Sequence, residues 1–188
     1  MKKFLIIMLT LILAVPALFA GETEDIKTLL GQFCTWDAEG NFTEKLAHLS
    51  PDFVEVDRGV TVNYEQTKWW MISLDGKHPE EYRLLLNSFR KMIDPDASEL
   101  PGDVVRNPEF VRDYEELTAK LRAASKSAAA LQLKTLKFVS VRIDGEAATA
   151  VIEYDAMISG EMTHIGHTME MRKVGGVWKI HKSVVAIK

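Results

Sequence analysis

The chain has few residues that could form covalent cross-links, and it has no excess of basic residues that would bind anionic partners. Its 188 residues include a single cysteine, Cys34, so no internal disulfide can form and the fold must rest on its hydrophobic core. Positive charge is not in excess, because 23 Lys and Arg residues stand against 27 Asp and Glu residues. No segment gathers the basic residues into a stripe, which argues against nucleic acid and anionic membrane surfaces as partners. The sequence also lacks internal repeats, and its one biased tract is the Ala-rich segment 123–130.

The one long apolar run lies at the N-terminus. Two lysines precede a mainly apolar run at 4–19, which is interrupted by Pro16 and followed by the small residues Ala20 and Gly21. This is the layout of a secretory signal peptide, with the cut expected after Ala20. The run is shorter than the ~20 residues that a spanning helix needs. We therefore expect residues 21–188 to be an exported, periplasmic or secreted protein of bacterial type, with no membrane contact once residues 1–20 are removed.

The remaining 168 residues suffice for one domain, because a chain of this length buries roughly 70% of its unfolded surface. Apolar positions at helical spacing predict a first helix that ends near Gly40-Asn41. The pattern then predicts a short helix over 42–50, strands over 52–57 and 60–63, and a third helix over 64–74 capped by Asn63. Residues 76–130 carry two amphipathic stripes joined by a Pro- and Gly-containing loop, which indicates a helical hairpin packed on the core.

The last third of the chain predicts four strands. Two-residue hairpin signals lie at 144–145, 159–160 and 175–176. They separate alternating segments at 131–143, 147–158, 162–173 and 177–187. Three successive hairpin turns make an antiparallel meander. The fold class is therefore α+β: a curved antiparallel sheet, formed by this meander and the N-terminal hairpin, packed on the N-terminal helices.

This order of elements resembles the nuclear transport factor 2-like superfamily, which includes ketosteroid isomerase and the SnoaL-like polyketide cyclases. Three segments carry the resemblance: "LLGQFCTWDAEGNFTEKLAHLSPDFVEVDRG", "VTVNYEQTKWWMIS" and "HTMEMRKVGGVWKIHKSVV". It implies a cone-shaped pocket between the concave face of the sheet and the helices, with 76–130 as an insertion. It implies no particular reaction, because no complete catalytic pattern of the isomerases can be laid onto these residues and the fold hosts many functions.

The turns also predict which strand residues lie opposite one another. The expected pairs include Asp155–His164, Ile152–His167, Met171–Ile180, Glu170–His181, His167–Val184, Val141–Ala148 and Val139–Ala150. Alternation then assigns one set to the apolar concave face: Val139, Val141, Ile152, Tyr154, Ile165, His167, Met169, Met171, Trp178, Ile180 and Val184. The solvated outer face receives Glu153, Asp155, His164, Thr168, Glu170, Arg172, Lys179, His181 and Ser183.

His164 and His167 therefore point to opposite faces, so no shared metal site is expected, and nothing in the sequence calls for a cofactor. His164 and His181 are interpreted as surface partners of Asp155 and Glu170. His167 has two interpretations. It is either a buried histidine hydrogen-bonded to a neighbour such as the Tyr154 hydroxyl, or a general base or ligand contact that burial keeps neutral.

The predicted pocket is lined by His167, Tyr154, Ile152, Ile165, Met169, Trp178, Trp70 and Trp36. Of the adjacent residues Trp69 and Trp70, one should wall the pocket and the other should meet the inserted helices. In strand 52–57 the alternation predicts Val54 and Val56 inward and Glu55 outward. Cys34 is interpreted as a buried, unreactive thiol.

Three functions remain open from the sequence. The first is an exported domain whose apolar pocket binds a small apolar or amphipathic molecule, with His167 and Tyr154 orienting it and the inserted helices over the opening. The second is an enzyme of the isomerase, dehydratase or cyclase type with His167 as general base. The third is a dimerisation or assembly module, a homodimer formed through the outer face of the sheet.

Overall fold

A computed structural model describes the backbone of residues 2–188 and the side chains of residues 21–188. The helices are α1 (Lys2–Glu39), α2 (Phe42–Ala47), α3 (Tyr64–Ser73), α4 (Pro79–Ile93), the 3-10 helix η1 (Gly102–Arg106) and α5 (Pro108–Thr135). The strands are β1 (Leu49–Asp57), β2 (Val60–Asn63), β3 (Lys137–Asp144), β4 (Ala147–Ile158), β5 (Glu161–Val174) and β6 (Val177–Ile187). The predicted α+β class is confirmed.

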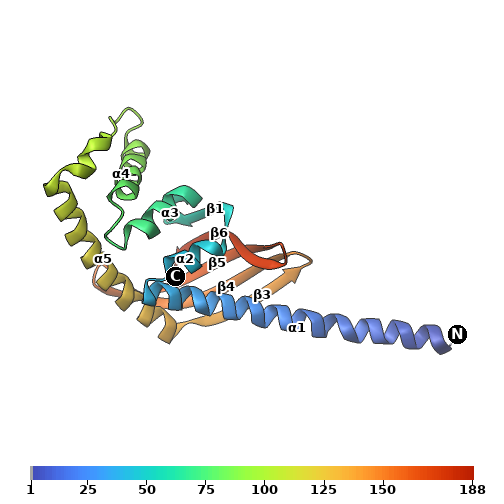
Figure 1. Ribbon diagram of the computed structural model, residues 1–188. Helices are drawn as coiled ribbons and strands as arrows, with labels where there is room; N and C mark the ends of the chain where they lie inside the picture. The colour runs from blue at the N-terminus through green and yellow to red at the C-terminus, as the bar shows by residue number, and fades with distance from the viewer. Residues whose placement is uncertain (1) are drawn as a thin grey trace.

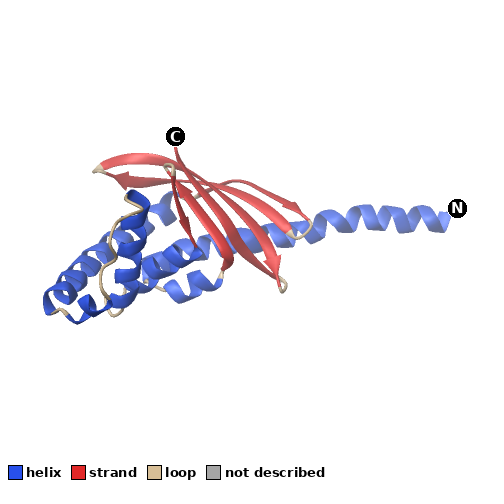
Figure 2. Ribbon diagram, turned by 90° about the horizontal axis from the view of Figure 1, so that it is seen from above, coloured by secondary structure: helices blue, strands red, loops and turns tan. Residues whose placement is uncertain are grey.

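The six strands form one curved sheet in the order β2-β1-β6-β5-β4-β3 (Figure 1). The predicted meander β3–β6 and the hairpin β1–β2 are both present and antiparallel. The sheet is nevertheless mixed, because β1 runs parallel to β6 where the two parts join. A parallel neighbour needs a long crossover connection, and the chain from α3 to β5 supplies it. Figure 2 shows the helices gathered on one side of this sheet.

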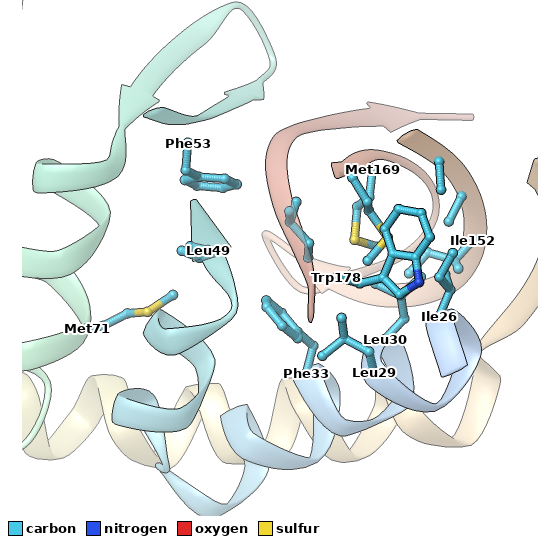
Figure 3. Packing of buried hydrophobic residues seen from close by; sticks show 14 residues of the cluster. Ile26, Leu29, Leu30, Phe33, Leu49, Phe53, Met71, Ile152, Met169 and Trp178 are labelled. Atoms are coloured by element: carbon cyan, nitrogen blue, oxygen red, sulfur yellow. The ribbon is translucent and has the colours of Figure 1, made fainter. Parts of the chain in front are cut away.

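The core lies between α1 and the concave face of the sheet. The α1 residues Ile26, Leu30 and Phe33 recur at helical spacing and pack against Ile152 and Trp178 (Figure 3). Ile26 and Ile152 are almost fully buried, at 0% and 1% exposure. The apolar stripe of the helix therefore fills much of the space under the sheet.

Close to the turns, the predicted register is confirmed at two of the three hairpins, those with turns at 159–160 and 175–176. Asp155 pairs with His164 and Ile152 with His167, on either side of a turn in which Ser159 and Gly160 both have positive φ. Met171 also lies opposite Ile180, as expected.

At the first turn the predicted register is wrong. Asp144 pairs with Ala147, so the turn residues are Gly145-Glu146, one position later than expected. Val141 consequently lies opposite Ala150 and not Ala148. Val139, expected on the concave face, falls at a bulge and is 54% exposed. The left-handed φ of +60° at Gly145 explains the shift, because glycine adopts this conformation at the first turn position without strain.

A second bulge changes the pairing of β5 with β6. The register shifts between Glu170 and Met171, so Glu170 lies opposite Lys182 and not His181. Beyond the bulge His167 pairs with Val185. Two residues therefore exchange faces: Val184 turns to the outer face, and Ser183 turns inward, where it is 3% exposed.

The predicted insertion 76–130 is helical but is not bounded as expected. Helix α5 continues to Thr135, through residues that the alternation had assigned to a strand. It packs along α1 and against β4, so tertiary contact favours the helix over the local period-2 pattern (Figure 1). Tyr114 of α5 accepts a hydrogen bond from the His78 backbone and donates one to the Ser73 carbonyl, which fixes the insertion to the end of α3.

The predicted leader falls on residues 1–20, whose side chains lie outside the described part of the chain. Its cleavage and the export of the protein therefore stay predictions. Among the residues that the structure describes, no helix combines the length and the apolar character needed to cross a membrane.

Candidate functional site

Glu55 of β1 occupies the centre of the candidate site. Phe53 is buried on the inner face of β1, and alternation carries Glu55 to the same face. The prediction that Val54 and Val56 face inward is therefore wrong. The bulky Phe53 sets the register, and Glu55 finds a partner inside: the Ser183 hydroxyl donates to its Oε2 atom over 3.3 Å.

A cavity of about 250 Å³ opens beside Glu55, between β1–β2 and helices α2, α3 and α4. Its lining comprises the apolar side chains of Val62, Trp70, Met71 and Phe89 and the polar ones of Lys45, Glu55, Gln66 and Thr67. Phe89 belongs to α4, so the inserted segment contributes one wall. The lining therefore combines aromatic and aliphatic side chains with a few polar groups, the usual character of a small-molecule site.

The two tryptophans of α3 separate as expected. Trp70 lines the cavity at Glu55, whereas Trp69 lines a different groove with Leu84 and Ser88 of α4. The α3 helix holds this arrangement through a capping box: the Asn63 side chain accepts from the Gln66 amide, and the Gln66 side chain accepts from the Asn63 amide. Gln66 also donates to Ser88, which joins α3 to α4.

Lys45 of α2 separates this cavity from a second one of about 220 Å³ under α5. Its ammonium group lies 2.6 Å from a carboxylate oxygen of Asp37 on α1, and both side chains are largely shielded from solvent. Trp70 and Met71 line both cavities. The Asp37–Lys45 ion pair and these two side chains therefore form a partition between the two spaces.

Burial controls the protonation of the site. It raises the pKa of Glu55 above its usual value, although nearby Lys45 and the Ser183 hydroxyl act in the opposite direction. Burial also raises the pKa of Tyr154, and it raises the pKa of the Cys34 thiol to about 11. These groups therefore hold their protons more firmly than they would in water. This agrees with the interpretation of Cys34 as an unreactive thiol.

His167 lies behind Glu55 on the same face, on β5. Its Nε2 atom is 2.6 Å from the Ser183 hydroxyl, while its Nδ1 atom is buried and has no hydrogen-bond partner among the described residues. Burial, followed by the charge of Lys45, lowers the pKa of His167 to about 4. The ring is therefore neutral at physiological pH. The expected bond to the Tyr154 hydroxyl is not formed: the two rings meet edge-on, with centroids 6.1 Å apart.

The remaining predicted pocket residues lie elsewhere on the concave side. Ile152, Met169 and Trp178 are each at most 6% exposed and pack in one cluster with the α1 side chains, and Ile165 is 3% exposed. Trp36 is half-buried, and its ring is tilted against those of Phe33 and His48, with ring centroids 5.5 and 5.0 Å away. These side chains belong to the core or pack against it, whereas the described cavity at Glu55 lies nearer to β1 and α3.

The outer face of the sheet carries charge pairs. His164 Nδ1 lies 2.9 Å from Asp155, as predicted, and its Nε2 atom lies 3.3 Å from Glu153. Asp155 first and Glu153 second raise the pKa of His164. Within the described part of the chain, no three His, Cys, Asp or Glu residues are placed to share a metal ion. This charged face is less apolar than obligate interfaces, so a homodimer through it stays a prediction.

Of the residues that line this cavity, sequence reasoning named only Trp70 as a pocket residue. It did not consider Lys45, and it assigned Glu55 and the supporting Ser183 to the outer face. The β-bulge that turns Ser183 inward has no local sequence signal. Glu55 could have been found by its position two residues after Phe53, the largest apolar side chain of its strand.

The arrangement of elements matches solved structures. A nuclear transport factor 2-like protein with a cystatin-like fold from Novosphingobium aromaticivorans has a TM-score of 0.50 and 12% identity, over 93% of this chain and 87% of that one. A protein of the same kind and of unknown function from Silicibacter pomeroyi has a TM-score of 0.45 and 13% identity, over 90% and 98% of the two chains. No family model matches the sequence, and no curated protein is detectably similar to it. The chain therefore has the nuclear transport factor 2-like fold.

Proposed function

We propose that this protein binds a small, mostly apolar molecule in the cavity at Glu55, and that the molecule presents a hydrogen-bond donor to this carboxyl group. The observation that carries the proposal is a largely shielded carboxyl group in the wall of a cavity that is also lined by aromatic and aliphatic side chains. The cavity of about 250 Å³ is slightly smaller than the ~300 Å³ at which ordinary ligand pockets begin. The ligand is therefore of one- or two-ring size.

The hydrogen-bond donor that we expect on the ligand is inferred from the free accepting capacity of the Glu55 carboxyl group. Ser183 donates to Oε2, and Oε1 has no hydrogen-bond partner among the described residues. The partial burial of the carboxyl group strengthens a hydrogen bond that Oε1 accepts, because water competes for it less. A hydroxyl, amide or amine group of a ligand in the cavity could donate to this oxygen.

The apolar part that we expect in the ligand is inferred from Trp70 and Phe89. These side chains come from α3 and from the inserted α4. Aromatic walls from two different elements favour a flat or ring-shaped ligand between them. His167 and Tyr154, which the sequence suggested as direct ligand contacts, are assigned here to the support behind Glu55.

We also propose that the site works outside the cytoplasm, as an exported periplasmic or secreted protein. The support is the order of two lysines, an apolar run and small residues within positions 1–20. Determining the N-terminal residue of the protein isolated from the periplasm or medium tests this: we expect Gly21, and an intact Met1 would contradict it.

A second candidate function is a proton-transfer enzyme of the isomerase, dehydratase or cyclase type. The observation in its favour is that Glu55 and His167, both with perturbed pKa values, are linked through Ser183. In this version Glu55, not His167, exchanges the proton with the substrate, because Glu55 is the group that lines the cavity.

A fragment screen tests the binding function. Hydroxyl- and amine-bearing aromatic fragments are compared with their methyl isosteres by thermal shift and by ligand-observed NMR. At 100 times its Kd, a ligand raises the unfolding temperature by roughly 5–10 °C for a chain of this size.

The matched variants are Glu55→Gln and Trp70→Ala, with Trp69→Ala as the control because Trp69 lines a separate groove. We expect the shift to disappear in the first two and to persist in the control. Hits that bind all three variants equally well, or methyl isosteres that bind as well as the donors, would contradict the proposal.

A further inference from the structure

Three residues from three neighbouring strands form a continuous hydrogen-bonded row under the sheet. Glu55 lies opposite Ser183 in the parallel β1–β6 pair, and Ser183 lies beside His167 across the β6–β5 pair. Ser183 Oγ is 3.3 Å from Glu55 Oε2 and 2.6 Å from His167 Nε2. Among the described residues, the hydroxyl of Ser183 is the one group that is hydrogen-bonded to both the carboxyl group and the imidazole.

A serine hydroxyl has only one proton to donate, and this constrains the whole row. When Glu55 is ionised, the Ser183 proton must go to the carboxylate. The short contact to His167 must then be an Nε2–H group donating to Ser183, which leaves Nδ1 bare. When Glu55 is protonated, its O–H group can donate to Ser183, whose own proton then turns to Nε2. In that arrangement Nδ1 carries the ring proton.

The charges around the row favour a change of tautomer over a change of charge. Asp37 on α1, Lys45 on α2 and Asp57 on β1 act on Glu55. His167 experiences Lys45 and Asp57, and it meets the neutral phenol of Tyr154. Burial disfavours an imidazolium ion here, so a proton that arrives at one ring nitrogen must be balanced by loss from the other.

We propose that Ser183 couples the protonation state of Glu55 to the tautomer of His167, so that the three residues act as one unit behind the ligand cavity. Ser183 is a positioning residue, because it acts through Glu55 and does not line the cavity. The assignment of the unit to ligand binding rests on the proposed function, since a donor bound to Glu55 would hold it ionised and fix the Nε2–H tautomer. The coupling itself exists without a ligand.

Side-chain NMR of the ligand-free, full-length protein tests the coupling. The ¹⁵N shifts of the His167 ring and the ¹³Cδ shift of Glu55 are followed together from pH 8 downward through the Glu55 titration. We expect Nε2–H at high pH, and a tautomer change with the same midpoint as the Glu55 carboxyl. His164 is an internal control, because its partners are Asp155 and Glu153 on the other face.

Two variants separate coupling from a structural role. Ser183→Ala should leave Glu55 titrating while the His167 tautomer no longer follows it, and Ser183→Thr, which keeps the hydroxyl, should restore the common midpoint. A His167 tautomer that stays constant through the Glu55 titration in the natural protein would overturn the proposal. So would a tautomer that still follows Glu55 in Ser183→Ala. No ligand is present, so these outcomes are independent of the fragment screen that tests the binding function.

Discussion

Replacing His167 with glutamine should remove a defined part of the pH dependence of stability. Burial keeps this histidine neutral in the folded state, where its pKa is about 4 compared with 6.5 for an ordinary histidine. Between these two values the unfolded chain binds more protons than the folded one. Stability is therefore fully present above pH 6.5 and is lost as the pH falls toward 4. Glutamine does not titrate and can still hydrogen-bond to Ser183.

The size of the effect follows from the pKa difference. Each pKa unit corresponds to 1.36 kcal/mol, so the lowered pKa of His167 costs about 3 kcal/mol of unfolding free energy between pH 7.5 and pH 4. Groups outside the Glu55–Ser183–His167 row titrate equally in the natural protein and in His167→Gln, so their contributions cancel. The difference between the two proteins therefore reports His167 together with any shift in the Glu55 titration that its removal causes.

Urea unfolding at pH 7.5, 5.5 and 4, followed by tryptophan fluorescence, measures this difference. We expect the natural protein to lose about 3 kcal/mol more than His167→Gln over the range. His164→Gln is the matched control with the opposite sign. Asp155 and Glu153 raise the pKa of exposed His164, so its contribution is present at low pH and declines as the pH rises through its folded pKa. If the natural protein and His167→Gln lose the same free energy, His167 is not buried as a neutral imidazole.

Three further substitutions or treatments test the packing. Ile152→Ala should lower the unfolding free energy by about 2–5 kcal/mol, because this side chain is 1% exposed under α1; urea unfolding gives the value, and a change below ~1 kcal/mol would contradict the core assignment. Gly76→Ala should lower the unfolding free energy by about 1–2 kcal/mol in the same assay, because Gly76 has a left-handed φ of +77°. A new Cβ would also lie 3.2 Å from Thr118 Oγ1. An unchanged stability would be evidence against this turn. Cys34, whose pKa burial raises to about 11, should react with a thiol reagent only after unfolding; fast reaction of the native protein would show that the thiol is accessible.

The meander could be predicted from sequence because hairpin signals and alternation act locally. Ser159-Gly160 fixed one register correctly, and Asn63 predicted the start of α3. The length of α5 could not be predicted in the same way. Its last turns alternate like a strand, and only packing against α1 selects the helix.

The candidate site was only partly accessible to sequence reasoning. The face of His167 and the separation of Trp69 from Trp70 could be predicted, because both depend on simple periodicity. Glu55 was assigned to the wrong face because the neighbouring Val54 and Val56 were predicted to be the buried residues of the strand. The buried side chain of Phe53 instead determines which face is inward. The inward orientation of Ser183 depends on a β-bulge in the pairing of β5 with β6. A bulge arises from the pairing of two strands, so the sequence of either strand alone does not predict it.

A crystal structure of the protein with the tightest-binding donor fragment tests the central claim most directly. The account predicts density between Trp70 and Phe89, with a donor atom of the fragment within hydrogen-bond distance of a Glu55 carboxylate oxygen. Density at another place on the molecule, or a fragment in the cavity whose donor points away from Glu55, would contradict it.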